Sequence, residues 1–317
     1  MQVKPGVIST KGVLVPLTDH VAIVSLTRDI PIRNILQAAA AVQKQLTRDF
    51  TPFWGLEATV DAFEDLDSVP SDYHHVVIFG DAEELRGRLD VAVGEAYASQ
   101  LIDDFDKDRL AGLHLNAFTR QPFALVEASD AWSVTLSHEI LEMIADPYGN
   151  RLVAAAHPLD PGQRVRYLLE VCDPCQTMWY PVNGVPVSDF CTPRYFDPVS
   201  VDRSRYSYTG AIQYPLEILE GGYVSWIDPR DSGLYQLGAG EREPVLVASI
   251  ARLARSSAPL RTVVDTNPRT PHITGASLRP AHSAPAASGS YNAVMAASEG
   301  AARKTAEAVV SLAMEAR

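Results

Sequence analysis

The chain has 317 residues, of which 46% are hydrophobic, and a formal net charge of −12 at pH 7. This length is enough for one large domain or two small ones with an ordinary hydrophobic core. The acidic balance, with no run of five or more lysines and arginines, argues against nucleic acid or an anionic membrane as a partner. A neutral or cationic substrate suits this charge better.

The first apolar stretch, residues 14–26, is interrupted by Pro16, Thr18, Asp19 and His20. It is therefore neither a signal sequence nor a membrane span, and no other stretch qualifies as either. We expect a cytoplasmic protein, with export that needs no cleaved signal as the alternative.

The first part of the chain alternates strands with helices. Asp29 is predicted as the N-cap of a helix over residues 32–46, with Pro31 in its first turn. Apolar, β-branched runs predict strands at residues 21–26, 56–63, 75–79 and 121–127. This order indicates an α/β or α+β fold, with a mixed sheet packed on two main helices.

A second helix, capped by Ser129 or Asp130, contains the most informative stretch, S-H-E-I-L-E-M-I-A-D-P at residues 137–147. On a helical wheel, apolar residues surround all but an arc of roughly 100°. That arc holds four ionisable residues: His138, Glu139, Glu142 and Asp146. A buried helix needs these charges compensated, and a divalent metal ion is the simplest compensator. A solvated helix face with i,i+4 ion pairs is the alternative.

The spacing of these residues sharpens the prediction. His138 and Glu142 lie one turn apart, with Cβ atoms about 5–6 Å from each other, so both can reach one ion at about 2.0–2.2 Å. Glu139 stands where the H-E-x-x-H motif holds its general base, although the second ligand here is glutamate. Asp146 lies about 12 Å along the axis from His138, so we expect it beside Glu142 or outside the ligand shell. Pro147 should end the helix.

A second acidic segment, L-L-E-V-C-D-P-C, follows at residues 168–175. Thermolysin-like zincins take a third ligand from a downstream glutamate. Glu170 is the first candidate for this ligand and Asp173 the second. An ordinary carboxylate at the end of a strand is the alternative for Glu170.

Three cysteines, Cys172, Cys175 and Cys191, are an odd number and do not suggest a disulfide framework. A redox C-x-x-C would open a helix, and no helical pattern follows Pro174. We expect buried thiols beside the carboxylates rather than a redox or cysteine–zinc site.

Three motifs together resemble a group of bacterial zincin-like metalloproteins. They are S-H-E-x-x-E-M-x-x-D-P at residues 137–147, E-V-C-D-P at 170–174 and G-V-x-V-S-D-F at 184–190. The resemblance runs from about residue 21 to about residue 228. It implies a zincin-like domain with a metal held by His138 and Glu142, and it specifies no substrate. In zincins the strand before the motif helix is often the edge of a sheet, along which an extended peptide pairs. Residues 123–126 could form such an edge strand, and an ordinary core strand is the alternative.

We expect residues 1–150 to form the zincin-like subdomain and residues 151–262 a β- and loop-rich subdomain that completes the cleft. The second contains turn signals at Asn183-Gly184 and Gly221-Gly222 and predicted strands at 206–210 and 223–226. A side chain that stabilises a reaction intermediate would come from this subdomain, the candidates being His157, Tyr167 and Tyr195. His114 could approach the metal from the strand layer, although a structural histidine is the commoner case.

The last segments differ in composition. Residues 263–290 are rich in Pro, Ser, Ala, Thr and Gly, which predicts a flexible linker. Residues 291–317 follow as an alanine-rich helical pattern, either a docking element for a partner or scaffold, or a frayed tail.

Two functions fit these patterns. In the first, the protein is a zinc-dependent hydrolase, most simply a metallopeptidase acting on a peptide or protein. His138, Glu142 and Glu170 hold the ion, which lowers the pKa of its water toward about 7, and Glu139 takes the proton. Two acidic ligands also suit harder metals such as Mn²⁺ or Ca²⁺. In the second, the protein is a non-catalytic metal-binding protein, whose ion is structural and joins the two subdomains. The C-terminal helix then recruits a partner.

Overall fold

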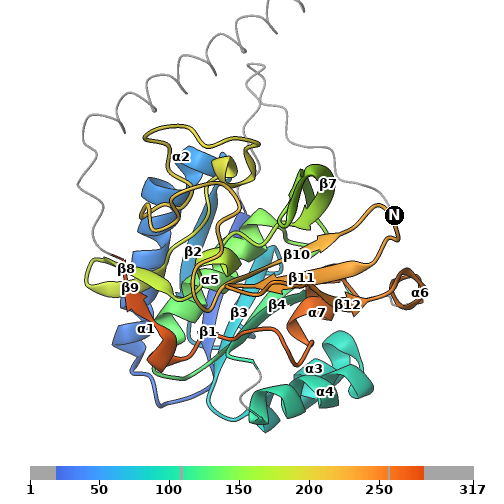
Figure 1. The fold of residues 1–317 in the computed structure, drawn as a ribbon. Helices are drawn as coiled ribbons and strands as arrows, with labels where there is room; N and C mark the ends of the chain where they lie inside the picture. Colours follow the sequence, from blue (N-terminus) through green and yellow to red (C-terminus); the bar gives the residue numbers. More distant parts are fainter. Residues whose placement is uncertain (1–18, 108–109, 256–257, 282–317) are drawn as a thin grey trace, which may run out of the picture. The chain divides into compact units, whose positions relative to one another are not determined.

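The computed structural model describes residues 19–107, 110–255 and 258–281, which form a mixed α/β structure with three sheets (Figure 1). The first sheet has the strand order β2-β1-β3-β5-β4, in which only β4 runs antiparallel to its neighbour. Its strands are β1 (Asp19–Ser25), β2 (Ala58–Phe63), β3 (Tyr73–Phe79), β4 (Gly112–Asn116) and β5 (Pro122–Glu127).

Helices cover both faces of this sheet (Figure 1). The alternation of side chains along β3 shows why: Val76 and Ile78 pack in the core with α1 (Ile32–Lys44) and α5 (Trp132–Ala145). Their neighbours Val77 and Phe79 point to the other face. There they pack on α3 (Arg86–Val93) and α4 (Glu95–Asp106). The two predicted main helices therefore form one layer, and α3 and α4 add a layer that the sequence analysis did not predict.

The second and third sheets follow α5 in the chain. The second is antiparallel, in the order β12-β11-β10-β7-β6, with β6 (Leu152–His157), β7 (Asp160–Leu168), β10 (Tyr223–Ile227), β11 (Leu234–Gly238) and β12 (Val245–Ala248). The third consists of β8 (Met178–Val182), β9 (Val185–Ser188) and β13 (Arg279–Pro280). The remaining helices are a π-helical turn at Gln45–Phe50, α2 (Thr51–Trp54), α6 (Ile250–Leu253) and α7 (Leu260–Asp265). Four 3₁₀ turns complete the described elements, at Ala82–Leu85, Asp173–Cys175, Pro193–Phe196 and Gly275–Ser277.

The predicted turn at Asn183-Gly184 is confirmed. It connects β8 and β9, and both residues have positive φ, 52° and 82°. This is the backbone of a type I′ hairpin turn, which Asn-Gly favours.

Two local predictions, the helix caps and one strand, are wrong, and for residues 123–126 the structure agrees with the ordinary core role. The N-cap residues are Pro31 for α1 and Ala131 for α5, and neither helix has a side-chain cap. Asp29, the predicted cap of α1, instead accepts a hydrogen bond from the hydroxyl of Thr27. The segment 206–210 forms no strand and makes only one bridge, from Ser207 to Cys191. Strand β5 is paired on both sides, by β3 and β4, so residues 123–126 offer no free edge to a peptide.

The first part of the predicted linker contains secondary structure. Helix α7 ends at Asp265, and β13 pairs with β8 through Arg279 and Pro280. The rest of the linker and the predicted helix at 291–317 lie outside the described residues. No helix in the described part of the chain is long and apolar enough to cross a membrane.

Candidate metal centre

Helix α5 is buried along nearly all of its length. Every residue from Val134 to Ala145 is buried, including His138 at 2% exposure and Glu142 at 0%. The helix lies between the first sheet and β9, and it stops one residue before Asp146-Pro147 as predicted. The alternative of a solvated helix face is therefore wrong.

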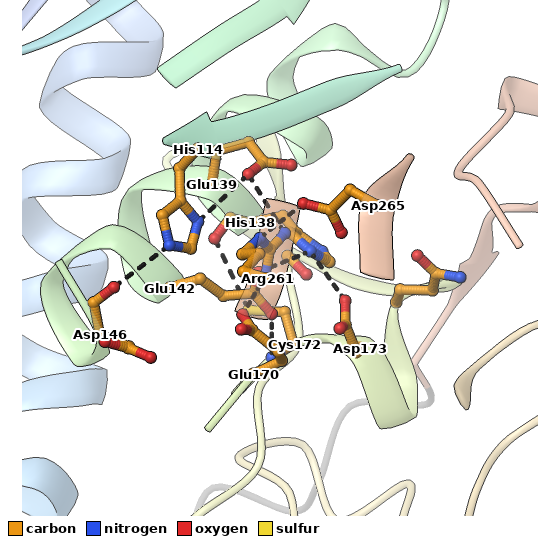
Figure 2. Close-up of polar contacts among 12 residues, drawn as sticks. His114, His138, Glu139, Glu142, Asp146, Glu170, Cys172, Asp173, Arg261 and Asp265 are labelled. Carbon is orange, nitrogen blue, oxygen red and sulfur yellow. Dashed lines mark hydrogen bonds and ion pairs between the residues drawn. The ribbon is translucent and has the colours of Figure 1, made fainter. Parts of the chain in front are cut away.

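Three side chains from two segments converge beside α5 (Figure 2). Nε2 of His138 lies 3.2 Å from Oε2 of Glu142 and 3.3 Å from Oδ1 of Asp173. Donor atoms on one tetrahedral metal ion, each at about 2.0–2.2 Å from it, lie roughly 3.3–3.6 Å apart. These atoms therefore have about the spacing of ligands that share an ion.

The segment after β7 is held against α5 by a hydrogen bond from its backbone to a side chain of the helix. The N–H of Cys172 donates to Oε1 of Glu142 at 3.0 Å, which brings Glu170 and Asp173 alongside the helix. Among the described residues, three groups have donor atoms close enough to hold a metal ion. They are His138–Glu142–Cys172, His114–Glu139–Glu142 and Glu142–Glu170–Asp173.

Arg261 of α7 is the site residue that the sequence analysis missed. Its guanidinium contacts the carboxylates of Glu142 and Glu170, and it lies 3.5 Å from Oε2 of Glu139 (Figure 2). Nε of Arg261 is also 3.0 Å from Oδ2 of Asp265, one turn further along α7. A six-residue helix that begins after Pro259 shows too little periodicity to be recognised in the sequence.

His114 on β4 lies on the other side of Glu139. Nδ1 of His114 is 3.6 Å from Oε2 of Glu139, while its Nε2 donates to the carbonyl oxygen of Asp146 at 3.2 Å. His114 therefore joins the strand layer to the end of α5, as a structural histidine would, and also faces the acidic cluster.

Asp146, predicted near the metal, points elsewhere. Its Oδ2 accepts a hydrogen bond of 2.6 Å from the N–H of Arg151, and it belongs to none of the donor groups found in the described residues. The structure gives Asp146 a local role in shaping the turn after α5.

A small pocket of about 20 Å³, with room for about one water molecule, adjoins the cluster. Its walls include His138, Glu139, Asp173, Tyr223, Arg261 and His272. None of the three side chains predicted to assist catalysis lines this pocket, where Tyr223 and His272 stand instead. Tyr167 and Tyr195 line a second pocket, which Glu170 and Asp173 also border. Nδ1 of His157 accepts from the N–H of Leu159.

The close approach of β4 to α5 requires a glycine. A Cβ atom at Gly112 would collide with Cγ2 of Thr135 and lie 2.8 Å from Oε1 of Glu139. We expect Gly112→Ala to destabilise the protein by about 1–3 kcal/mol through overpacking, measured by urea unfolding. The control is Gly87→Ala in α3, where an added Cβ meets nothing within 4 Å. Equal stability of the two variants would contradict this packing.

The buried cluster contains more acidic than basic side chains, and this shifts the pKa values of its members. Burial opposes ionisation of Glu142, yet Arg261 and His138 hold its pKa far below the ordinary value. Burial likewise opposes protonation of His138, but Glu142 and Asp173 raise its pKa well above the ordinary value. The pKa of Glu170 is raised, first by burial and then by Glu142, despite the opposing effect of Arg261.

The number of acids explains these opposing shifts. Five buried carboxylates (Glu139, Glu142, Glu170, Asp173 and Asp265) face one arginine, Arg261, and two imidazoles, those of His114 and His138. Nδ1 of His138, Oε1 of Glu170 and Oδ1 of Asp173 also have no hydrogen-bond partner, although Oδ1 of Asp173 keeps its ion pair with His138. Buried charges and polar atoms are costly when they are left without compensation. The donor set therefore fits a bound cation.

The predicted buried thiols are confirmed. All three cysteines are free and buried, and burial raises the pKa of each. Cys172 stands beside His138 and Glu142, whereas Cys175 and Cys191 interact with each other.

The structure thus contains a buried His/Glu cluster able to hold a metal ion. Comparisons with protein-family models, curated proteins and solved structures found no match, so the assignment of a function depends on this geometry.

Proposed function

We propose that the protein binds a divalent metal ion at His138, Glu142 and Asp173 and acts as a metal-dependent hydrolase of the zincin type. The observation that supports this most directly is the distance of two buried carboxylate oxygens from Nε2 of His138, 3.2 Å for Oε2 of Glu142 and 3.3 Å for Oδ1 of Asp173. Asp173 replaces Glu170 as the first candidate for the third ligand, because Oδ1 of Asp173 lies 3.3 Å from Nε2 of His138. Zinc is the favoured metal, and the acid-rich set also suits Mn²⁺ or Ca²⁺.

When bound, such an ion lowers the pKa of a coordinated water and polarises a substrate carbonyl. Glu139 is placed to act as the general base, because it lines the pocket directly after the first ligand. Arg261, whose Nη2 lies 3.5 Å from Oε2 of Glu139, holds the carboxylate in position to take a proton and return it to the leaving group. We propose a peptide or another acyl compound as substrate.

Glu139→Gln tests the enzymatic proposal. We expect hydrolysis of labelled casein or p-nitrophenyl acetate to fall by about 10²- to 10⁴-fold, because proton transfer is lost. The metal content, measured by inductively coupled plasma mass spectrometry, should stay unchanged because Glu139 is not in the proposed ligand set. The exposed Glu83→Gln serves as control. Wild-type protein that binds metal yet shows no activity that Glu139→Gln removes would contradict the enzyme proposal.

A structural ion is the second candidate, favoured by one observation. The donor groups connect α5, which packs on the first sheet, to the segment that follows β7 of the second sheet. An ion there would join the two parts, as the sequence analysis considered. In that case chelation should lower the melting temperature without loss of any activity, and recruitment of a partner through residues 291–317 is proposed as the function.

A further inference from the structure

The metal-binding proposal leaves Arg261 unexplained. The guanidinium is only 3% exposed, and its Nη1 contacts Oε2 of Glu142 and Oε2 of Glu170. Oε2 of Glu142 is also the atom closest to Nε2 of His138. Arg261 therefore uses the same carboxylate oxygen that the proposed metal site needs.

We infer that Arg261 is a built-in competitor of the metal ion and regulates loading of the site. This inference rests on the proposed function. A guanidinium and a divalent cation cannot both contact Oε2 of Glu142 at bonding distance, because the two positive charges would repel each other strongly in a buried site. Metal binding thus requires Arg261 to withdraw from Glu142, and withdrawal of Arg261 favours metal binding.

Helix α7 gives Arg261 an alternative partner. Asp265 lies one turn further along the helix, with Oδ2 3.0 Å from Nε of Arg261. When Nη1 leaves Glu142, the charge of Arg261 remains paired with Asp265 on its own helix. The proposed exchange therefore leaves no unpaired charge on α7.

The backbone of α7 is attached to the turn after α5 rather than to the carboxylates. The N–H of Arg261 donates to the carbonyl of Gly149, and the N–H of Leu260 donates to Oδ1 of Asn150, both at 3.0 Å. Val263 and Val264 pack in a separate apolar cluster with β10, β11 and β12. A side-chain movement of Arg261 alone thus frees Glu142 without loss of these contacts.

The test is the affinity for Zn²⁺, measured by isothermal titration calorimetry. We expect Arg261→Gln to bind Zn²⁺ about 5- to 150-fold more tightly than wild type, the usual range of coupling between two sites. Arg261→Lys keeps the positive charge, so its affinity should stay near that of wild type. Arg151→Gln is the matched control, because it removes a positive charge from a nearby arginine that bonds the carbonyl of Ala145 and none of the clustered carboxylates.

A second measurement covers the case in which Arg261→Gln folds poorly. Coupling is reciprocal, so Zn²⁺ should weaken the hold of Arg261 in the wild-type protein. Hydrogen exchange of the guanidinium N–H groups of Arg261, measured by NMR, is expected to rise when Zn²⁺ binds, because Nη1 loses its carboxylate partner on Glu142.

Three outcomes separate the two proposals. Tighter binding by Arg261→Gln alone, or faster exchange of the guanidinium N–H groups of Arg261 with Zn²⁺, supports the competition. Measurable Zn²⁺ binding that is equal in wild type, Arg261→Gln and Arg151→Gln overturns the competition and leaves the metal site intact. Failure of all variants to bind Zn²⁺ or Mn²⁺ overturns the metal site itself, and the competition with it.

Discussion

Glu142→Gln is expected to abolish metal binding and to destabilise the metal-free protein. Glu142 contributes an oxygen to every one of the three candidate donor groups found in the described residues. The variant keeps the volume of the side chain and an oxygen for the N–H of Cys172. It loses the charge that faces both His138 and Arg261. The side-chain NH₂ group of the glutamine would then face two other hydrogen-bond donors, His138 and Arg261.

The expected magnitudes are large because the group is fully buried. Removal of one partner from a buried ion pair typically costs about 3–5 kcal/mol, which urea unfolding in the presence of a chelator would measure. The affinity for Zn²⁺ should fall by at least about 100-fold, the upper end of what changes to supporting residues cause. Asp146→Asn is the control, because Asp146 lies on the same helix end but bonds Arg151 instead of the cluster. Equal loss of affinity in both variants would show that the ligand set is wrong.

Helix α5 and its candidate metal ligands could be predicted from the sequence for a physical reason. Fourteen residues of helix, with apolar side chains around most of the wheel, give a strong periodic signal, and Pro147 fixes the end. Since a buried helix cannot leave His138 and Glu142 uncompensated, the site followed from the same pattern. The parallel strands were also visible as short β-branched runs.

The remainder of the site depends on tertiary contacts that local patterns do not encode. Arg261 is 119 positions from Glu142 in the chain, and α7 has only six residues. Asp173 exceeds Glu170 as a candidate ligand only because the 3₁₀ turn Asp173–Cys175 aims it at His138. Neither fact follows from spacing along the sequence.

The helical layers were also predicted only in part. Helices α1 and α5 were predicted but α3 and α4 were not, because their packing on the sheet involves residues far away in the chain. Helix α4 carries Asp103, Asp104 and Asp106 in its last turns, and such a polar stretch does not by itself predict a buried helix. Its buried residues Leu101, Ile102 and Phe105 nevertheless pack against Phe79 and other side chains of the sheet. Tertiary packing therefore outweighed the local polarity.

The pH dependence of stability provides the sharpest separate test of the cluster, through Glu170→Gln in the metal-free protein. Burial, and then the charge of Glu142, raise the pKa of Glu170 in the folded state. A carboxyl whose pKa is raised on folding lowers stability as the pH rises from its unfolded pKa through its folded pKa. Glutamine does not ionise. The variant should therefore be more stable than wild type at pH 8, by about 1.4 kcal/mol for each unit by which folding raises this pKa, and the gain should vanish below about pH 4.

Glu142→Gln is the matched comparison, because Glu142 is also buried and also contacts Nη1 of Arg261. Its pKa is lowered in the folded state, where Arg261 and His138 outweigh burial. The sign is then opposite: ionised Glu142 stabilises the fold above its unfolded pKa, and the stability is lost as the pH falls through the folded pKa. The stability lost in Glu142→Gln should thus be nearly constant from pH 8 to about pH 4 and shrink below that pH, whereas the stability gained in Glu170→Gln grows from about pH 4 upward.

Addition of Zn²⁺ should reverse the sign for Glu170→Gln if Glu170 takes part in metal binding. A ligand that binds only the folded state adds stability that grows with its affinity, and a carboxylate that is unfavourable beside Glu142 becomes favourable beside a divalent ion. With Zn²⁺ at pH 8, wild type should therefore become the more stable protein. A gain for Glu170→Gln that persists unchanged with bound Zn²⁺ would exclude Glu170 from the ligands and leave the third position to Asp173.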